Sequence, residues 1–289
     1  MNNNYYSTVK RILIIIMFLN VGVALAKIIY GYLTNSLSMV SDGFHSMFDG
    51  ISNVIGIIGI VIASRPPDKT HPYGHSKFET FAAIGIAVLL FVTCFELLQS
   101  AVEKFLNPST PEITLTSFII MGATILVNIG VSTYENRKGQ ELGSEILIAD
   151  SRHTRSDIFV SIAVIIGFVA IRFGYPIVDP IIAVIIALLI ARMGIEIIKE
   201  SSGVLLDAAV IDAEKIRDIV CSIPGVDDCH RVRTRGTQSN VYVDLHVTLA
   251  SCYTLDEAHN ISHQVEEKLK ETITGVNDVV VHIDPCEDE

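Results

Sequence analysis

The chain has 289 residues, of which 50% are hydrophobic and 18% are charged, and its mean hydropathy is +0.48. This composition is unusual for a soluble globular protein and favours insertion into a membrane. The net charge of -11 comes from the last 90 residues, where 18 acidic side chains outnumber 7 basic ones. Because such a region repels phosphates and attracts cations, we do not expect nucleic acid as a partner.

Six apolar stretches are long enough to cross a bilayer, which requires about 20 mainly apolar residues per helix. A signal peptide is a weaker interpretation of the first stretch, because its apolar run continues beyond Lys27. We expect an α-helical membrane protein whose transport domain spans residues 1–206. The stretches are residues 11–33, 38–63, 81–103, 115–134, 146–171 and 177–198.

Basic residues near the ends of these stretches are distributed unequally between the two sides. The positive-inside rule therefore predicts that both termini are cytoplasmic. We expect an integral protein of the cell (inner) membrane, surrounded by lipid. Lys10, Arg11, Arg65, Lys69, Lys77, Arg137, Lys138 and Lys199 fall on one side, and Lys104 and Arg172 fall on the other.

The second and fifth stretches each contain the pattern HxxxD, at His45 and Asp49 and again at His153 and Asp157. Residues four apart lie on the same face of a helix, so each pattern presents an imidazole beside a carboxylate. Each pair lies roughly 13 Å into its helix, and the two helices run in opposite directions, so the pairs should meet near the midplane. Two nitrogens and two oxygens suit tetrahedral zinc better than calcium or magnesium.

Asp42 precedes His45 by three residues and so points in a similar direction. It is a candidate for supporting the metal ligands, for carrying protons or for lining an entrance.

A short cytoplasmic loop after the second stretch contains Asp68, His71 and His75, which are candidate ligands for a metal at the entrance. The alternative is a solvated loop with a turn at Pro72 and Gly74.

Residues 207–289 have the pattern of a small soluble domain. Helical periodicity covers residues 211–222 and 254–271, and strand patterns cover residues 229–235, 240–249 and 277–284. The order αββαβ predicts a two-layer, ferredoxin-like α+β unit.

Five histidines lie in this acidic domain, and several share a face with another histidine or a carboxylate. Their clustering favours metal binding over ordinary surface histidines. The five cysteines are odd in number and form no CxxC pair, which favours reduced thiols in the cytoplasm. The candidate ligands are His230, His246, His259, His263, His282 and Asp284.

The paired HxxxD patterns, the loop HPYGHSKFE and the ending HIDPC together resemble the cation diffusion facilitator family, over nearly the whole chain. The resemblance implies a membrane transport site at His45, Asp49, His153 and Asp157. It also implies a homodimer whose cytoplasmic domains bind zinc through His230, His246, His259, His282 and Asp284, and it places His263 where some relatives have a carboxylate. An ion pair between Lys77 and Asp207 is implied as a hinge or dimer lock.

We therefore expect a zinc/proton antiporter that works by alternating access, with protons and divalent metal ions as its partners and zinc as a further structural or regulatory ion. Export of manganese, iron or cobalt is an alternative, because imidazole and carboxylate also suit these metals. A membrane-anchored metal sensor without transport is the alternative from another class. We do not expect an enzyme, because the chain has no HExxH and no evident general base beside a bound water.

Overall fold

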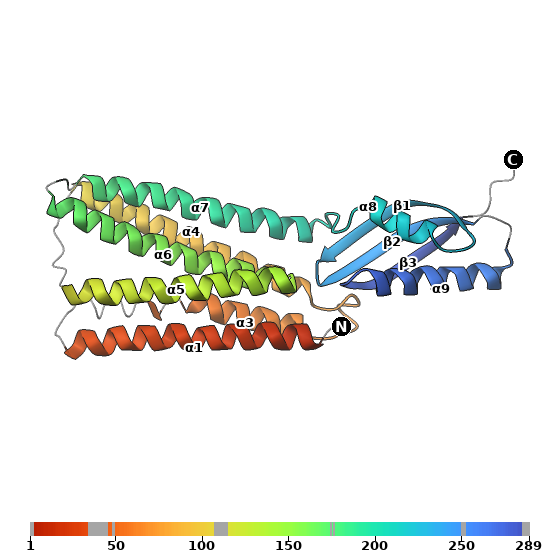
Figure 1. Cartoon of the computed structure of the whole chain (residues 1–289), viewed down its shortest axis with the longest axis horizontal. Helices are drawn as coiled ribbons and strands as arrows, with labels where there is room; N and C mark the ends of the chain where they lie inside the picture. The colour runs from red at the N-terminus through yellow and green to blue at the C-terminus, as the bar shows by residue number, and fades with distance from the viewer. Residues whose placement is uncertain are drawn as a thin grey trace. The chain divides into compact units, whose positions relative to one another are not determined.

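The computed structural model describes residues 3–33, 46–47, 50–106, 115–173, 175, 177–249 and 253–284. The chain forms two compact units that divide between Ser201 and Ser202. The first is helical and the second combines helices with a sheet (Figure 1).

Long helices lie side by side in the helical unit (Figure 1). A helix occupies each of the six predicted apolar ranges, although the second range is described mainly over its later half, as α3. The helices are α1 (Asn3–Leu33), α3 (Ile51–Ala63), α4 (Lys77–Leu106), α5 (Leu115–Leu142), α6 (Glu145–Arg172) and α7 (Val178–Leu205).

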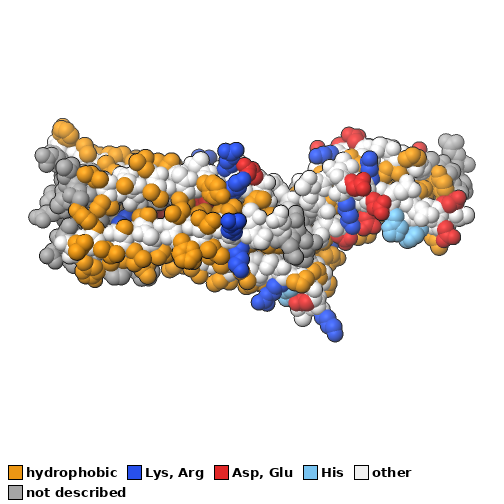
Figure 2. Space-filling model, turned by 60° about the horizontal axis from the view of Figure 1, so that its bottom comes forward, with side chains coloured by type: hydrophobic (Ala, Val, Ile, Leu, Met, Phe, Trp, Pro, Cys, Tyr) orange, Lys and Arg blue, Asp and Glu red, His pale blue; other side chains and the backbone are white. Residues whose placement is uncertain are grey.

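Apolar side chains cover the outside of this unit as well as filling its core. Phe18, Phe95 and Leu126 are each about two-thirds exposed or more, and Figure 2 shows the apolar cover over the visible face, with basic side chains gathered near one end of it. Lipid is the solvent that suits such a surface. Within the part of the chain that the structure describes, three helices contain segments long and apolar enough to span a bilayer, at Asn4–Tyr30, Lys77–Glu103 and Pro180–Leu205.

The interior of the helical unit combines close apolar packing with polar side chains. Leu13, Ile86 and Ile146 are fully buried in its core. At Gly59, an added Cβ would lie 2.3 Å from the Cβ of Ala82, so glycine permits the close approach of α3 and α4. The buried polar side chains lie mainly on α3, α4, α5 and α6.

The second unit follows the predicted order αββαβ. It contains α8 (Ala213–Cys221), β1 (Val226–Thr237), β2 (Asn240–Leu249), α9 (Leu255–Thr272) and β3 (Val276–Asp284). The sheet order is β1-β2-β3, with β1 antiparallel to β2 and β2 parallel to β3. The α9 crossover allows the parallel pairing, and a capping box between Thr254 and Glu257 begins this helix.

Alternation along β2 gives the sheet two different faces. Val243, Leu245 and Val247 are buried with the apolar sides of α8 and α9. Asp244, His246 and Thr248 alternate with these residues and are only partly buried. The helices therefore cover one face, and the candidate ligand His246 lies on the other.

Candidate metal sites

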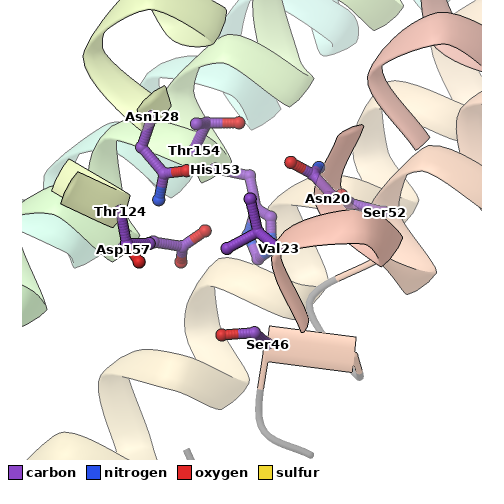
Figure 3. Close-up of a pocket in the computed structure, with 9 residues that line it drawn as sticks. All are labelled: Asn20, Val23, Ser46, Ser52, Thr124, Asn128, His153, Thr154 and Asp157. Carbon is purple, nitrogen blue, oxygen red and sulfur yellow. The ribbon is translucent and has the colours of Figure 1, made fainter. Parts of the chain in front are cut away.

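His153 and Asp157 lie one turn apart on α6 and both line a cavity within the helical unit (Figure 3). His153 is only 4% exposed, so its imidazole lies deep in the bundle. The cavity has a volume of about 30 Å³, enough for about two water-sized groups. Its other lining residues are Asn20, Val23, Ser46, Ser52, Thr124, Asn128 and Thr154.

The cavity is polar on more than one side. Thr124 and Asn128 from α5 lie near Asp157, and Asn20 and Ser52 lie across from them (Figure 3). These side chains provide further oxygen atoms that a small cation or its hydration water could contact.

The predicted partners His45 and Asp49, and also Asp42, lie outside the described residues. Ser46, which follows His45 in the chain, lines the cavity and accepts a hydrogen bond of 2.8 Å from Lys27. The structure thus brings the neighbour of His45 to the cavity that contains His153 and Asp157.

A second polar group, which sequence reasoning missed, joins α1, α3, α5 and α6. Asn20 Nδ2 donates to Asn53 Oδ1 at 2.9 Å, and Asn53 Nδ2 donates to Asp150 Oδ2. The Thr154 hydroxyl lies 3.4 Å from Glu135 Oε2 and 3.2 Å from the backbone oxygen of Asp150, and it can donate to either. Glu135 and Asp150 are both 0% exposed, so two carboxyl groups are fully buried close to the candidate transport site.

The Asp150 position was visible in the sequence as part of a longer repeat. Asp42 precedes His45 by three residues, and Asp150 precedes His153 by the same interval, so both stretches read DxxHxxxD. No sequence pattern marks Glu135 in the same way, because it lies at the end of its predicted stretch. Its proximity to Asp150 depends on how α5 packs against α6.

Another buried carboxylate, Glu79, also escaped prediction. It accepts hydrogen bonds from Tyr5 at 2.7 and 2.8 Å and from Ser144 at 2.6 Å. These contacts connect α1, α4 and the residue that precedes α6. Tyr5 and Ser144 together reach both oxygens of Glu79, which indicates a structural role.

The loop residues Asp68, His71 and His75 form a group with metal-ligand spacing. Asp68 lies 3.5 Å from His71 Nδ1 and 3.5 Å from His75 Nε2. Hydrogen bonds from the Thr70 side chain and the His71 backbone lower the pKa of Asp68 well below its usual range, which keeps it ionised. Gly74, at φ 82°, completes the turn that brings the two histidines together.

The strand histidines meet because of the sheet register. His230 pairs with His246 across β1 and β2, and His246 pairs with His282 across β2 and β3. Asp284 Oδ2 lies 3.0 Å from both His230 Nε2 and His246 Nδ1, and these three residues form a second group with metal-ligand spacing. The hydrogen bond with His246 lowers the pKa of Asp284.

The remaining predicted residues take different places. His282 Nε2 lies 3.3 Å from Asp284 Oδ1, at the edge of the strand group. His259 and His263 form a separate pair on α9, with their Nε2 atoms 3.1 Å apart. Lys77 and Asp207 belong to different units, so their expected ion pair stays a prediction.

Cys229 precedes His230 but faces the other way, into the apolar core with an exposed fraction of 2%. Burial raises the pKa of its thiol to about 11, so it remains protonated and is a poor metal ligand.

The family model for the cation efflux transmembrane domain matches residues 13–206, and the model for the cation efflux protein cytoplasmic domain matches residues 209–286. An uncharacterized transporter of Methanocaldococcus jannaschii is 34% identical over 96% of this chain and 98% of its own length. The manganese efflux system protein of Bacillus subtilis is 33% identical over 90% of each chain. The cation-efflux pump of Shewanella oneidensis is 28% identical over 91% of this chain and 89% of its own length.

These matches cover both units, and the resemblance recognised from the HxxxD patterns is thereby confirmed. The chain belongs to the cation diffusion facilitator family.

Proposed function

We propose that this protein exports a divalent metal from the cytoplasm in exchange for protons, and that zinc is the preferred metal. The observation that carries the proposal is the polar cavity at His153 and Asp157 within a bundle whose outer surface is apolar. Polar groups inside a membrane bundle are costly and usually serve a transport path.

The transport site consists of His45, Asp49, His153 and Asp157 in this proposal. Ser46 at the cavity supports the participation of the second stretch, because it follows His45 directly. Two imidazoles and two carboxylates provide the four ligands that zinc prefers, and their weaker binding compared with four thiolates suits reversible loading. Asp42 supports these ligands or carries protons.

Alternating access would expose this site first to the cytoplasm and then to the other side. Imidazoles bind a metal only when they are deprotonated, so protons arriving from outside favour its release. We place six membrane-spanning helices in residues 1–206 and both termini in the cytoplasm of a cell whose inner membrane contains the protein. The uneven distribution of basic residues supports this orientation.

Residues 207–289 form a cytoplasmic domain that binds zinc and holds a homodimer in the proposal. The group of His230, His246 and Asp284 supports it, because two imidazoles and one carboxylate provide most of a zinc coordination sphere. His282, His259 and His263 add ligands there or at a second ion, and Asp68, His71 and His75 bind an ion in the loop. An ion pair between Lys77 and Asp207 serves as a hinge.

Manganese is the second candidate substrate, and two observations favour it. The cavity contains oxygen donors from Asn20, Thr124 and Asn128 in addition to Asp157, and oxygen ligands suit manganese better than zinc. One relative of similar length is a manganese efflux system protein. Iron and cobalt are further alternatives with the same ligand types.

The decisive experiment is metal uptake into proteoliposomes under an imposed pH gradient. Zinc, manganese, iron and cobalt are compared for the wild type, for Asp157→Asn, and for Asp218→Asn as an exposed control in the other unit. We expect uptake that depends on the gradient, is largest for zinc, and is lost in Asp157→Asn but retained in Asp218→Asn.

Larger uptake of manganese than of zinc would show that manganese is the preferred substrate, and the proposed exchange for protons would still hold. Uptake of no metal, with zinc still bound by the cytoplasmic domain, would refute transport and support a membrane-anchored sensor. Equal uptake by Asp157→Asn and the wild type would place the transport site elsewhere.

A further inference from the structure

The buried carboxyl groups of Glu135 and Asp150 need a positive partner. They lie within hydrogen-bonding reach of each other, and both residues are 0% exposed. Two like charges this close, away from water, cannot both stay ionised without compensation. Some cation must therefore bind to the pair.

The described part of the chain provides no basic side chain for this purpose. Neither Glu135 nor Asp150 forms an ion pair with a lysine, arginine or histidine among these residues. Arg155, which follows Thr154 on α6, donates to Ser132 on α5 at 3.2 Å. Asp157 adds a further negative charge near Glu135.

The hydrogen bonds from the described neighbours reach only one side-chain oxygen of each carboxyl group. Asn20 donates to the amide oxygen of Asn53, which leaves the Asn53 amide nitrogen directed at Asp150. The Thr154 hydroxyl lies 3.4 Å from Glu135 Oε2 and 3.2 Å from the backbone oxygen of Asp150, so its single hydrogen serves one of the two. Donors of this kind stabilise the ionised oxygen that they reach, so a proton suits the oxygens that they do not reach.

One oxygen of each carboxyl group remains after these contacts. Oε1 of Glu135 and Oδ1 of Asp150 are buried and receive no hydrogen bond from a described donor. A proton on either carboxyl group would give the pair the missing donor and remove one negative charge.

We propose that Glu135 and Asp150 share one proton, and that this proton leaves when a metal ion binds at His153 and Asp157. Asp150 lies three residues before His153 and seven before Asp157, so all three share one side of α6. A divalent ion at the site offsets the negative charge of Asp157 near Glu135, so the shared proton is held less tightly. The release step rests on the proposed function, but the shared proton does not.

The test is infrared spectroscopy of the full-length protein in lipid nanodiscs at neutral pH. A protonated carboxyl group has a carbonyl stretch that is distinct from the bands of ionised carboxylates. We expect this band in the wild type and its loss in both Glu135→Gln and Asp150→Asn. Glu141→Gln is the matched control, because Glu141 is exposed on the same helix and paired with Arg137 and Lys138.

Addition of zinc tests the coupling. It should remove the band from the wild type but leave it in a variant in which His153 and Asp157 are both alanine. A pH indicator should also detect about one proton fewer per bound zinc in Glu135→Gln than in the wild type.

A band that is absent from the wild type, or that survives in both carboxyl variants, would overturn the shared proton. Zinc that removes the band even without His153 and Asp157 would show that the pair itself binds metal. A wild-type band that zinc leaves unchanged would overturn the coupling. Proteoliposome uptake is measured separately, so a missing band with normal uptake refutes only this inference, and a normal band without uptake refutes only the proposed function.

Discussion

Replacement of Asn53 by alanine should destabilise the helical unit, because Asn53 joins three helices with one side chain. It is 1% exposed, accepts a hydrogen bond from Asn20 on α1 and donates one to Asp150 on α6. Asp150 without its donor costs roughly 1–3 kcal/mol, and the lost neutral bond to Asn20 adds about 1 kcal/mol. The total, roughly 2–4 kcal/mol, is a large part of a typical folding free energy of about 5–15 kcal/mol.

The assay is thermal unfolding of the full-length protein in detergent, followed by circular dichroism. At about 2–4 °C per kcal/mol for a unit of this size, Asn53→Ala should lower Tm by roughly 5–15 °C. Gln140→Ala is the control, because Gln140 is an exposed amide on α5, and its effect should stay within about 0.5 kcal/mol.

A double-mutant cycle separates the two hydrogen bonds of Asn53. Asn20→Ala alone should cost about 0.5–1.5 kcal/mol, and the double variant should cost less than the sum of both single losses by a similar amount. An Asn53→Ala variant that melts with the Gln140→Ala control would refute the assignment of this side chain as a link between α1 and α6. Strict additivity in the cycle would refute the Asn20 contact.

Three further predictions concern other contacts. Tyr5→Phe should cost roughly 1–3 kcal/mol of stability in the same melting assay, because buried Glu79 loses a donor to both oxygens; an unchanged Tm would contradict this. Thr254→Ala should cost about 1 kcal/mol by removing the α9 cap. The Thr254 hydrogen bonds lower the pKa of Glu257, so this carboxylate stabilises the fold above its ordinary pKa and loses that effect as the pH falls through its lowered pKa. The stability lost in Thr254→Ala, measured by urea unfolding, should therefore become smaller in acid. A stability loss that becomes larger in acid would refute this pH dependence. Asp284→Asn should weaken zinc binding by the full-length protein at least tenfold in calorimetry, and unchanged affinity would exclude Asp284 as a ligand.

The order of elements could be predicted from the sequence because local patterns determine it. Apolar runs marked the helices of the first unit, and the change from period 3.6 to period 2 marked α8, β1, β2, α9 and β3. The strand register could not be predicted in this way. Placement of His230 opposite His246, and of His246 opposite His282, depends on pairing between distant segments.

The same distinction between local pattern and long-range packing applies to the candidate site residues. His153 and Asp157 were predicted because four residues on one helix define a shared face. Asp150 lies on the same face, three residues before His153, as the first residue of the DxxHxxxD repeat. It was not predicted because only the shorter HxxxD pattern was recognised. Glu135 becomes meaningful only when α5 packs against α6 and brings it to Asp150, which no spacing along one helix reveals.

The average hydropathy of the helices in the first unit is related to which of them line the candidate transport cavity. α1, α4 and α7 are more apolar on average than α5 and α6. Those two helices contribute five of the nine residues that line the cavity, and both carboxyl groups of the buried pair. A helix that must present polar groups to a bundle interior loses average hydropathy, whereas helices that mainly face lipid keep it. Substitutions that make the cavity-facing sides of α5 or α6 more apolar should therefore impair proteoliposome uptake more than equal substitutions on α7.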